Sequence, residues 1–130
     1  MKVSELIGES LDHWVARAEG YASRAHVPDE KCGAMDAGES DGKISAWCPS
    51  SNWFQAGPII YRESIGLYDG TRWGEPGKPP NSCIWFACVG GAPNYGAHLE
   101  GPGEEFAGPT PLVAAMRAYV GSKFGNEVYE

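Results

Sequence analysis

The chain has 130 residues, 42% of them hydrophobic and 12% aromatic, which excludes a disordered polymer and predicts a single domain over residues 1–130. Its formal charge is −7 without any block of lysine or arginine, which argues against non-specific binding to duplex nucleic acid. No apolar run approaches the roughly 18 residues that span a bilayer, and no signal-peptide pattern opens the chain. We therefore expect a cytoplasmic protein without membrane association.

The turn-forming residues and the cysteines indicate the kind of fold and argue against a metal site. The 18 glycines and 10 prolines favour short elements joined by long loops over a helix bundle. In a cytosolic protein the four cysteines are expected to be free and largely packed. His26 and Cys32 lie close in the sequence, but two ligands without a matched second pair are a weak zinc signal. We predict neither a metal site nor a cofactor.

The first predicted element is an amphipathic helix within residues 3–19. Gly20 is typical of a residue that ends a helix. The apolar residues recur at positions i, i+3, i+4 and i+7, which places them on one side of the helix: Leu11, Trp14, Val15 and Ala18. This side is most simply part of the core.

Short strands are predicted between this helix and the C-terminal region. Residues 83–89 form a continuous apolar run, whose length and aromatic content favour a central strand buried on both faces. Other strands are expected at residues 21–27 (an edge strand), 44–48, 58–61 and 62–68. Surface loops rich in glycine are expected at residues 30–43, 69–82 and 90–103.

A second amphipathic helix is predicted near the C-terminus. Thr110 offers a hydroxyl at the N-cap position, Pro111 occupies the first helical position, and Gly125 ends the helix. Apolar residues follow at helical spacing: Leu112, Ala115, Met116, Tyr119 and Val120. The helix N-terminus could hold an anion, which makes Thr110 a candidate ligand residue, although such a threonine more often caps the helix itself.

These elements together predict an α+β fold. We expect two amphipathic helices on one face of a small, mainly antiparallel sheet, with residues 83–89 as the central strand. Long loops rich in glycine and proline would form the opposite rim. The richness in aromatic residues also leads us to expect a homo-oligomer.

Residues 48–63 contain the side chains most suited to recognising a ligand. Small polar side chains in a turn can face a ligand or bond to the local backbone, and aromatics beside them supply a flat apolar wall. A guanidinium can bind phosphate or carboxylate through two parallel hydrogen bonds. The alternative is a structural loop followed by an ordinary strand. The candidate ligand-binding residues here are Ser50, Ser51, Asn52, Trp53, Phe54, Gln55, Arg62 and Glu63.

Three blocks of the sequence carry a family resemblance. They are residues 4–6 (SEL) with 11–20 (LDHWVARAEG), residues 49–63 (PSSNWFQAGPIIYRE) and residues 107–120 (AGPTPLVAAMRAYV). In this order they resemble the NinX-like family, small phage-encoded proteins grouped as a domain of unknown function. Asn52 stands where the family usually has aspartate and Tyr61 where an acidic residue is usual, and the loops at 28–43 and 69–82 also differ. The change at Asn52 removes one charge from any site centred there.

The resemblance implies a phage accessory protein made in the cytoplasm of a host bacterium. Small accessory proteins of this kind often counter host defence, and one way to do so is to bind and hold a nucleotide signal without catalysis. That would require a dissociation constant near or below the nanomolar range, roughly −12 kcal/mol. For a ligand such as an ADP-ribose derivative or a cyclic nucleotide, most of the surface must be buried, often at a subunit interface.

Three functions remain open at this stage. In the first, a base of the nucleotide stacks on Trp53 or Phe54 and its phosphate pairs with Arg62. In the second, the acidic surface and the aromatic residues Trp73 and Tyr95 block a basic site on a host protein. The third is a nucleotide-acting hydrolase, for which the candidate acids or bases are Glu63, His26 and His98. The sequence places no recognisable nucleophile or metal cluster beside them, so we expect binding without catalysis.

Overall fold

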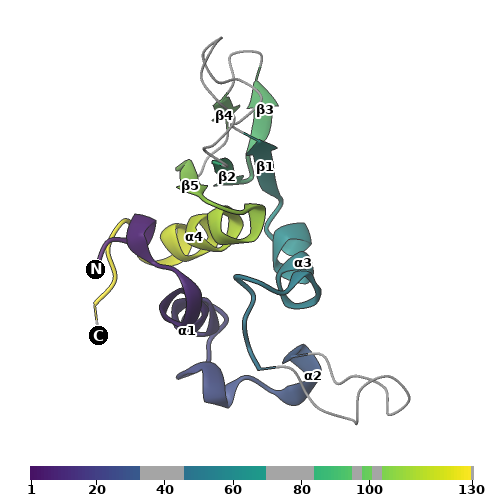
Figure 1. The fold of residues 1–130 in the computed structure, drawn as a ribbon, viewed down its shortest axis with the longest axis vertical. Coiled ribbons are helices and arrows are strands. Elements are labelled where there is room, and N and C mark those ends of the chain that lie inside the picture. The colour runs from purple at the N-terminus through teal and green to yellow at the C-terminus, as the bar shows by residue number, and fades with distance from the viewer. Residues whose placement is uncertain (33–45, 70–83, 95–97, 101–103, 130) are drawn as a thin grey trace.

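The computed structural model describes residues 1–32, 46–69, 84–94, 98–100 and 104–129 of the chain. Within them the fold is α+β, as predicted, and a three-stranded antiparallel sheet accompanies the helices (Figure 1). The α-helices are α1 (Gly8–Ala18), α2 (Asp29–Cys32), α3 (Trp53–Arg62) and α4 (Pro111–Phe124). The strands are β1 (Ile65–Asp69), β2 (Trp85–Val89), β3 (Ala92–Asn94), β4 (His98–Glu100) and β5 (Phe106–Gly108). The 3-10 helices are η1 (Val3–Glu5) and η2 (Arg24–His26).

Helix α4 is the centre of the fold. It packs against the three strands of the sheet on one side and against α1 and η1 on the other, so it lies between the sheet and α1 (Figure 1). Every residue from 112 to 120 is buried. The prediction that this helix is amphipathic is therefore wrong, because two layers cover it and leave no polar side. Its limits are confirmed: Thr110 Oγ1 accepts a hydrogen bond from the Val113 N–H at 3.1 Å, and Gly125 follows the last helical residue.

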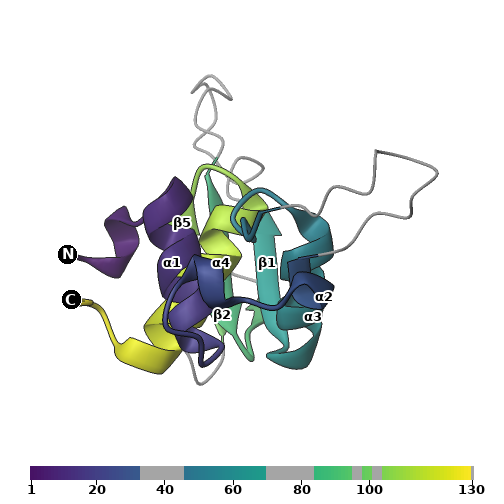
Figure 2. The same cartoon turned by 90° about the horizontal axis from the view of Figure 1, so that it is seen from below.

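The other helices surround α4. Helix α1 buries the predicted residues Leu11, Trp14 and Val15 and packs chiefly on α4, so the two helices form successive layers over the sheet. The chain leaves α1 through Gly20, whose φ of +96° suits glycine and confirms the predicted stop. Helix α3 lies at the side of this stack next to β1, and α2 packs against α3 (Figure 2).

The sheet has the order β1-β2-β5, which confirms the predicted central strand. Ala87 and Cys88, two successive residues of β2, are both buried, so the middle of this strand is covered on both faces. Within the predicted loop of residues 90–103, β3 and β4 form a short antiparallel hairpin, so the prediction of a plain loop is wrong there. Cys83 and the predicted loop at 70–82 lie outside the described residues.

Two other predicted strands are helical. Residues 24–26 form η2, where an edge strand was expected at 21–27, and residues 58–61 belong to α3. The alternation of apolar residues in these segments was too short to distinguish the two-residue period of a strand from the period of about 3.6 residues of a helix. At residues 58–61 the N-cap at Asn52 favours the helix. Of the strand expected at 44–48 the described part, 46–48, is not a strand, and the remainder lies outside the described residues, as does most of the loop expected at 30–43.

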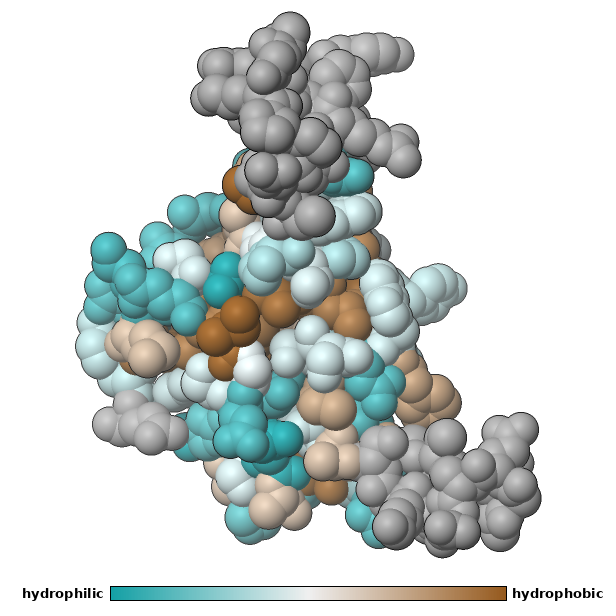
Figure 3. Space-filling view, viewed as in Figure 1, coloured by the Kyte–Doolittle hydropathy of each residue, from teal (hydrophilic) through white to brown (hydrophobic). Residues whose placement is uncertain are grey.

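The two ends of the chain lie side by side (Figure 1). The Met1 ammonium donates to the Val128 carbonyl at 2.9 Å, and the Val3 N–H donates to the Asn126 carbonyl at 2.9 Å. Nearby, buried Arg117 donates from Nε to Leu6 O and from Nη1 to Ala107 O, each at 2.8 Å, and burial lowers the pKa of its guanidinium. Arg117 thereby joins α4 to η1 and β5. The most hydrophobic surface in Figure 3 crosses the middle of the molecule at the level of α4.

Candidate functional site

The segment that leads into α3 is anchored by α1. The Asp12 side chain is buried, and its Oδ1 accepts a hydrogen bond from the Ser50 N–H at 2.8 Å. The indole Nε1 of buried Trp47 donates to the Asp12 carbonyl at 3.1 Å. Burial raises the pKa of the Asp12 carboxyl, and the hydrogen bonds from Ser50 oppose that rise. These bonds position the start of α3 relative to the core.

Polar residues at the start of α3 are used by the fold. Asn52 Oδ1 accepts a hydrogen bond from the Phe54 N–H at 2.9 Å and so caps the helix. Gln55 is buried, and its Oε1 accepts from the Cys48 N–H at 2.6 Å. The same side chain donates from Nε2 to the carbonyls of Cys32 at 3.0 Å and Ala46 at 2.9 Å. The amide of Gln55 therefore ties together three chain segments and is satisfied within the protein.

At the other end of α3, Arg62 lies in a network with α1 and α4. Its Nη1 and Nη2 donate to Glu19 Oε1 and Oε2 at 3.3 and 2.9 Å, and Nη2 also donates to Tyr119 Oη at 3.1 Å. Burial lowers the pKa of Arg62, but the hydrogen bonds and charge of Glu19 outweigh it and raise the pKa. Burial and Glu19 together raise the pKa of Tyr119. The guanidinium is thus already paired with a carboxylate.

Aromatic side chains of α3 remain open to solvent. The exposed fractions of Trp53, Phe54 and Tyr61 are 55%, 65% and 89%. Beside Trp53 and Phe54 lies a groove of about 540 Å³, which we call the α3 groove. It is lined by Glu19, Glu30, Lys31, Trp47, Trp53, Phe54, Gln55, Pro58, Ile59 and Arg62. Trp53 and Arg62, both candidate ligand-binding residues from the sequence, therefore line the same concavity.

The structure brings together only part of the predicted set. Trp53, Phe54, Gln55 and Arg62 line the α3 groove. The others lie elsewhere or serve the fold: Ser50 binds Asp12, Ser51 Oγ donates to the Cys48 carbonyl at 3.4 Å, Asn52 caps α3, Glu63 pairs with Lys123 at 3.4 Å, and Thr110 caps α4.

Other groove residues were not predicted from the sequence. Trp47 lies under the groove, Glu19 ends α1, and Glu30 and Lys31 belong to α2. They come from three segments that only the tertiary fold places next to α3. The one available signal was the tryptophan at position 47, five residues before the N-cap Asn52, which the sequence assigned to a strand.

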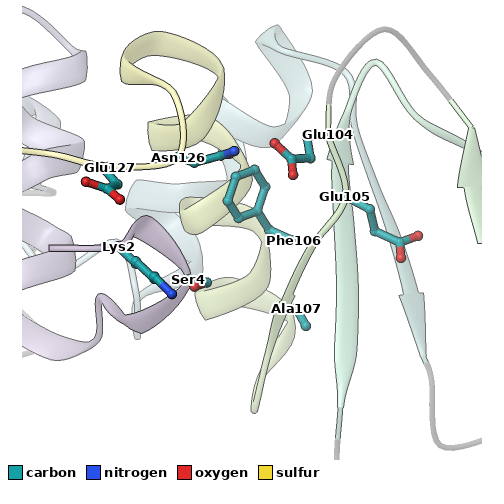
Figure 4. Close-up of a pocket in the computed structure, with 8 residues that line it drawn as sticks. All are labelled: Lys2, Ser4, Glu104, Glu105, Phe106, Ala107, Asn126 and Glu127. Carbon is teal, nitrogen blue, oxygen red and sulfur yellow. The ribbon is translucent and has the colours of Figure 1, made fainter.

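A second pocket of about 430 Å³ lies where the chain ends meet β5 (Figure 4). The Phe106 ring points into it between Glu104 and Asn126, whereas Glu105 points to the opposite side of the strand. Lys2 and Glu127 border the same pocket. Phe106 and Ala107 are its only apolar lining residues, so it offers less flat apolar surface than the α3 groove.

The candidate acids and bases are not assembled into a catalytic group in the described part of the chain. Glu63 pairs with Lys123, and His26 Nδ1 lies 2.7 Å from Ser23 Oγ. The side chain of His98 lies outside the described residues, as do Trp73 and Tyr95. Among the residues that the structure describes, no three histidine, cysteine, aspartate or glutamate side chains lie together as metal ligands. The prediction that the protein has neither metal nor cofactor stays a prediction.

Comparison with known proteins identifies the family. No match to the chain was found among curated proteins. No helix in the described ranges is long and apolar enough to cross a membrane. The family model described as Bacteriophage P22, NinX matches residues 2–123 and so covers α1, α3, the sheet and nearly all of α4. The chain therefore belongs to the NinX family of phage proteins.

Proposed function

We propose that this phage protein acts by binding rather than by catalysis, and that the α3 groove holds a small nucleotide-type ligand. The chemical class is an ADP-ribose derivative or a cyclic nucleotide. Acting in the cytoplasm of the host bacterium, the protein would lower the free concentration of a defence signal and so protect the phage. The observation that carries this proposal is that Trp53, Phe54 and Arg62 line one groove of about 540 Å³.

The size and walls of the groove fit such a ligand. Small-molecule sites commonly have volumes of about 300–1,000 Å³ and apolar or aromatic walls with a few polar groups. Trp53 and Phe54 offer exposed ring faces, and stacking of a base on an aromatic side chain is worth about 1–3 kcal/mol. Trp47 and Ile59 extend the apolar wall.

Charge in the groove favours a ligand with few negative charges. Lys31 and Arg62 border it, but so do Glu19 and Glu30, and Glu19 already neutralises Arg62. A phosphate would therefore bind Lys31 first and would pair with Arg62 only by displacing the Glu19 carboxylate. A cyclic or diester phosphate, with one charge per phosphorus, fits this balance better than a terminal monophosphate.

Isothermal titration calorimetry with a panel of cyclic dinucleotides and of cyclic and linear ADP-ribose derivatives tests the proposal. We expect at least one member to bind, and Trp53→Ala to weaken its binding at least about tenfold through lost stacking. Tyr129→Ala is the matched control, because Tyr129 is an exposed aromatic outside the α3 groove. If no member of the panel gives heat in the titration or raises the melting temperature of the protein, the proposal is refuted.

A second candidate function is inhibition of a host protein with a basic site. It is favoured by the net charge of −7 and by the carboxylates of Glu104 and Glu127 at the second pocket. Capture of one stoichiometric basic partner from host lysate, lost on Glu104→Lys with Glu127→Lys but kept on Trp53→Ala, would favour this function over the first. Retention of the partner by the charge-reversed variant would exclude it.

A further inference from the structure

The outward side of α3 is apolar from Trp53 to Tyr61. It comprises Trp53, Phe54, Gly57, Pro58 and Tyr61, and we call it the α3 aromatic face. The inward side of the same helix consists of Gln55, Ala56 and Ile59, which are buried. Helix α3 thus has apolar residues on both sides, and its outer side has three large aromatic rings that are more than half exposed. Exposed apolar patches of this kind are typical of interaction sites.

The spacing of residues along the α3 aromatic face allows the face to pair with the same face of a second copy. Trp53, Gly57 and Tyr61 follow one another at intervals of four residues, so they form one row along the helix. Gly57 lies at the midpoint, and a Cβ built there would meet nothing within 4 Å. The missing Cβ also relieves the clash with the ring of Pro58. If two such helices cross antiparallel at Gly57, each Trp53 lies opposite a Tyr61.

Charge permits such a contact. The protein carries −7 overall, yet residues 53–61 include no charged side chain. At the end of the face, Arg62 is neutralised by Glu19. Two copies can therefore meet here without bringing like charges into a desolvated contact, which costs several kcal/mol at other interfaces.

We propose that the α3 aromatic face binds the same face of a second copy of the chain, with the two α3 helices antiparallel about a two-fold axis at Gly57. In a two-fold interface the same surface of both copies meets, so that surface must be complementary to itself. The row of Trp53, Gly57 and Tyr61 meets this requirement, because it can pair with the same row running in the opposite direction. Trp53 would contact the partner's Tyr61, and aromatic pairs of this kind stabilise interfaces beyond their buried area.

The available area indicates a moderate interface. The exposed parts of the three rings amount to about 400 Å² per copy, since a whole aromatic side chain buries about 150–250 Å². A standard interface buries about 800 Å² per partner, so the rings supply about half of it as an apolar centre. The surrounding surface of α2 and of residues 46–52 would form the rim.

The pairing also deepens the proposed function, on which this consequence rests. Trp53 belongs both to the face and to the α3 groove, so the partner's Tyr61 would lie at the mouth of the groove. The second copy would then cover a ligand that one chain alone leaves open to solvent. A covered ligand buries more surface, which favours tight binding.

Sedimentation velocity and light scattering of the full chain test the pairing. At protein concentrations on the order of 100 μM, suited to an interface of moderate area, we expect twice the 13.9 kDa mass of one chain. Tyr61→Glu should convert the protein to a monomer, because it buries a charge in each copy of the face. Tyr129→Glu, the same substitution at a 75% exposed tyrosine off the face, should leave the dimer intact. A monomeric wild-type protein, or a dimer that persists in Tyr61→Glu, overturns the proposal.

A charge exchange tests the antiparallel register. Trp53→Lys alone should also give a monomer, whereas the double variant with Trp53→Lys and Tyr61→Glu should regain the dimer, because each lysine would then face a glutamate of the other copy. Within one helix the two positions are eight residues, about 12 Å, apart and do not pair. Circular dichroism checks that every variant is folded. A double variant that stays monomeric overturns the register.

Ligand binding separates this inference from the proposed function. A monomer that binds a nucleotide would disprove the pairing and leave the groove proposal standing. A dimer that binds no member of the nucleotide panel would disprove the groove proposal and leave the pairing standing. If both hold, Tyr61→Glu should weaken binding of the ligand found in the panel at least about tenfold, as the cover over the groove is lost.

Discussion

Helices α4 and α3 use apolar residues in opposite ways. Helix α4 is buried at nine consecutive positions, because the sheet covers one side and α1 with η1 covers the other. Helix α3 buries only one side, against β1 and α4, and turns Trp53, Phe54 and Tyr61 outward. The first helix therefore stabilises the fold, whereas the second presents a surface that the described chain itself does not cover. The difference shows that an apolar helix has to be assigned by what covers it, not by its composition.

The strongest test of the role of α4 is Arg117→Ala. The substitution leaves the carbonyls of Leu6 and Ala107 without their buried donor, and each unsatisfied carbonyl costs about 1–3 kcal/mol. We expect the free energy of unfolding in urea to fall by about 3 kcal/mol or more. A loss well below 1 kcal/mol would show that these bonds do not hold η1 and β5 to α4.

A smaller loss is expected from Gly121→Ala, in the last turns of α4. Alanine normally favours a helix over glycine, but a Cβ at this position would overlap the ring of Phe106 on β5. We expect thermal and urea unfolding to show a loss of about 1–3 kcal/mol, as for other overpacked cores. Adding Phe106→Leu should recover part of that loss; an additive double variant would contradict the packing explanation.

The contact between α1 and the entry to α3 can be tested at Asp12. Asp12→Ala removes the acceptor for the Ser50 N–H and should cost about 1–3 kcal/mol, whereas Asp12→Asn keeps an acceptor and should cost less. The raised pKa of Asp12 means that its charged form opposes folding at pH values above that pKa. The penalty disappears as the pH falls through the folded-state pKa and is absent below the ordinary value of 3.8.

We therefore expect the wild-type protein to gain stability relative to Asp12→Asn as the pH falls from 7 toward 4, measured by urea unfolding at each pH. Taking the difference between the two proteins cancels the titration of the other carboxylates. A difference that is independent of pH would contradict the burial of a charged Asp12.

The smallest effect on stability is expected on α3. Phe54→Ser changes a side chain that is 65% exposed, so the free energy of unfolding should change by less than about 0.5 kcal/mol. Self-association or ligand binding should nevertheless weaken. A large loss of stability would mean that the outward side of α3 is part of the core, and the contrast with α4 would not hold.

Local signals in the sequence were sufficient for some of the candidate site. The sequence predicts Trp53, Phe54 and Arg62 as ligand-binding residues, and these three residues do line one groove. Gln55 looked similar in sequence but is buried and satisfied by three backbone partners, because its neighbours Cys32 and Ala46 come from segments that fold over it. Lys31 and Glu19 gave no signal, since nothing in their own surroundings places them near residue 53.

The sequence by itself determined the family, the α+β class, the two long helices with their stops, and the central strand, because capping residues and apolar runs act over a few neighbours. Only the tertiary structure decided that residues 58–61 are helical, that α4 is buried on all sides, and that Arg62 is paired with Glu19. Those outcomes depend on which layers cover an element and which charges meet across the fold. Both are properties of long-range packing that short sequence patterns do not contain.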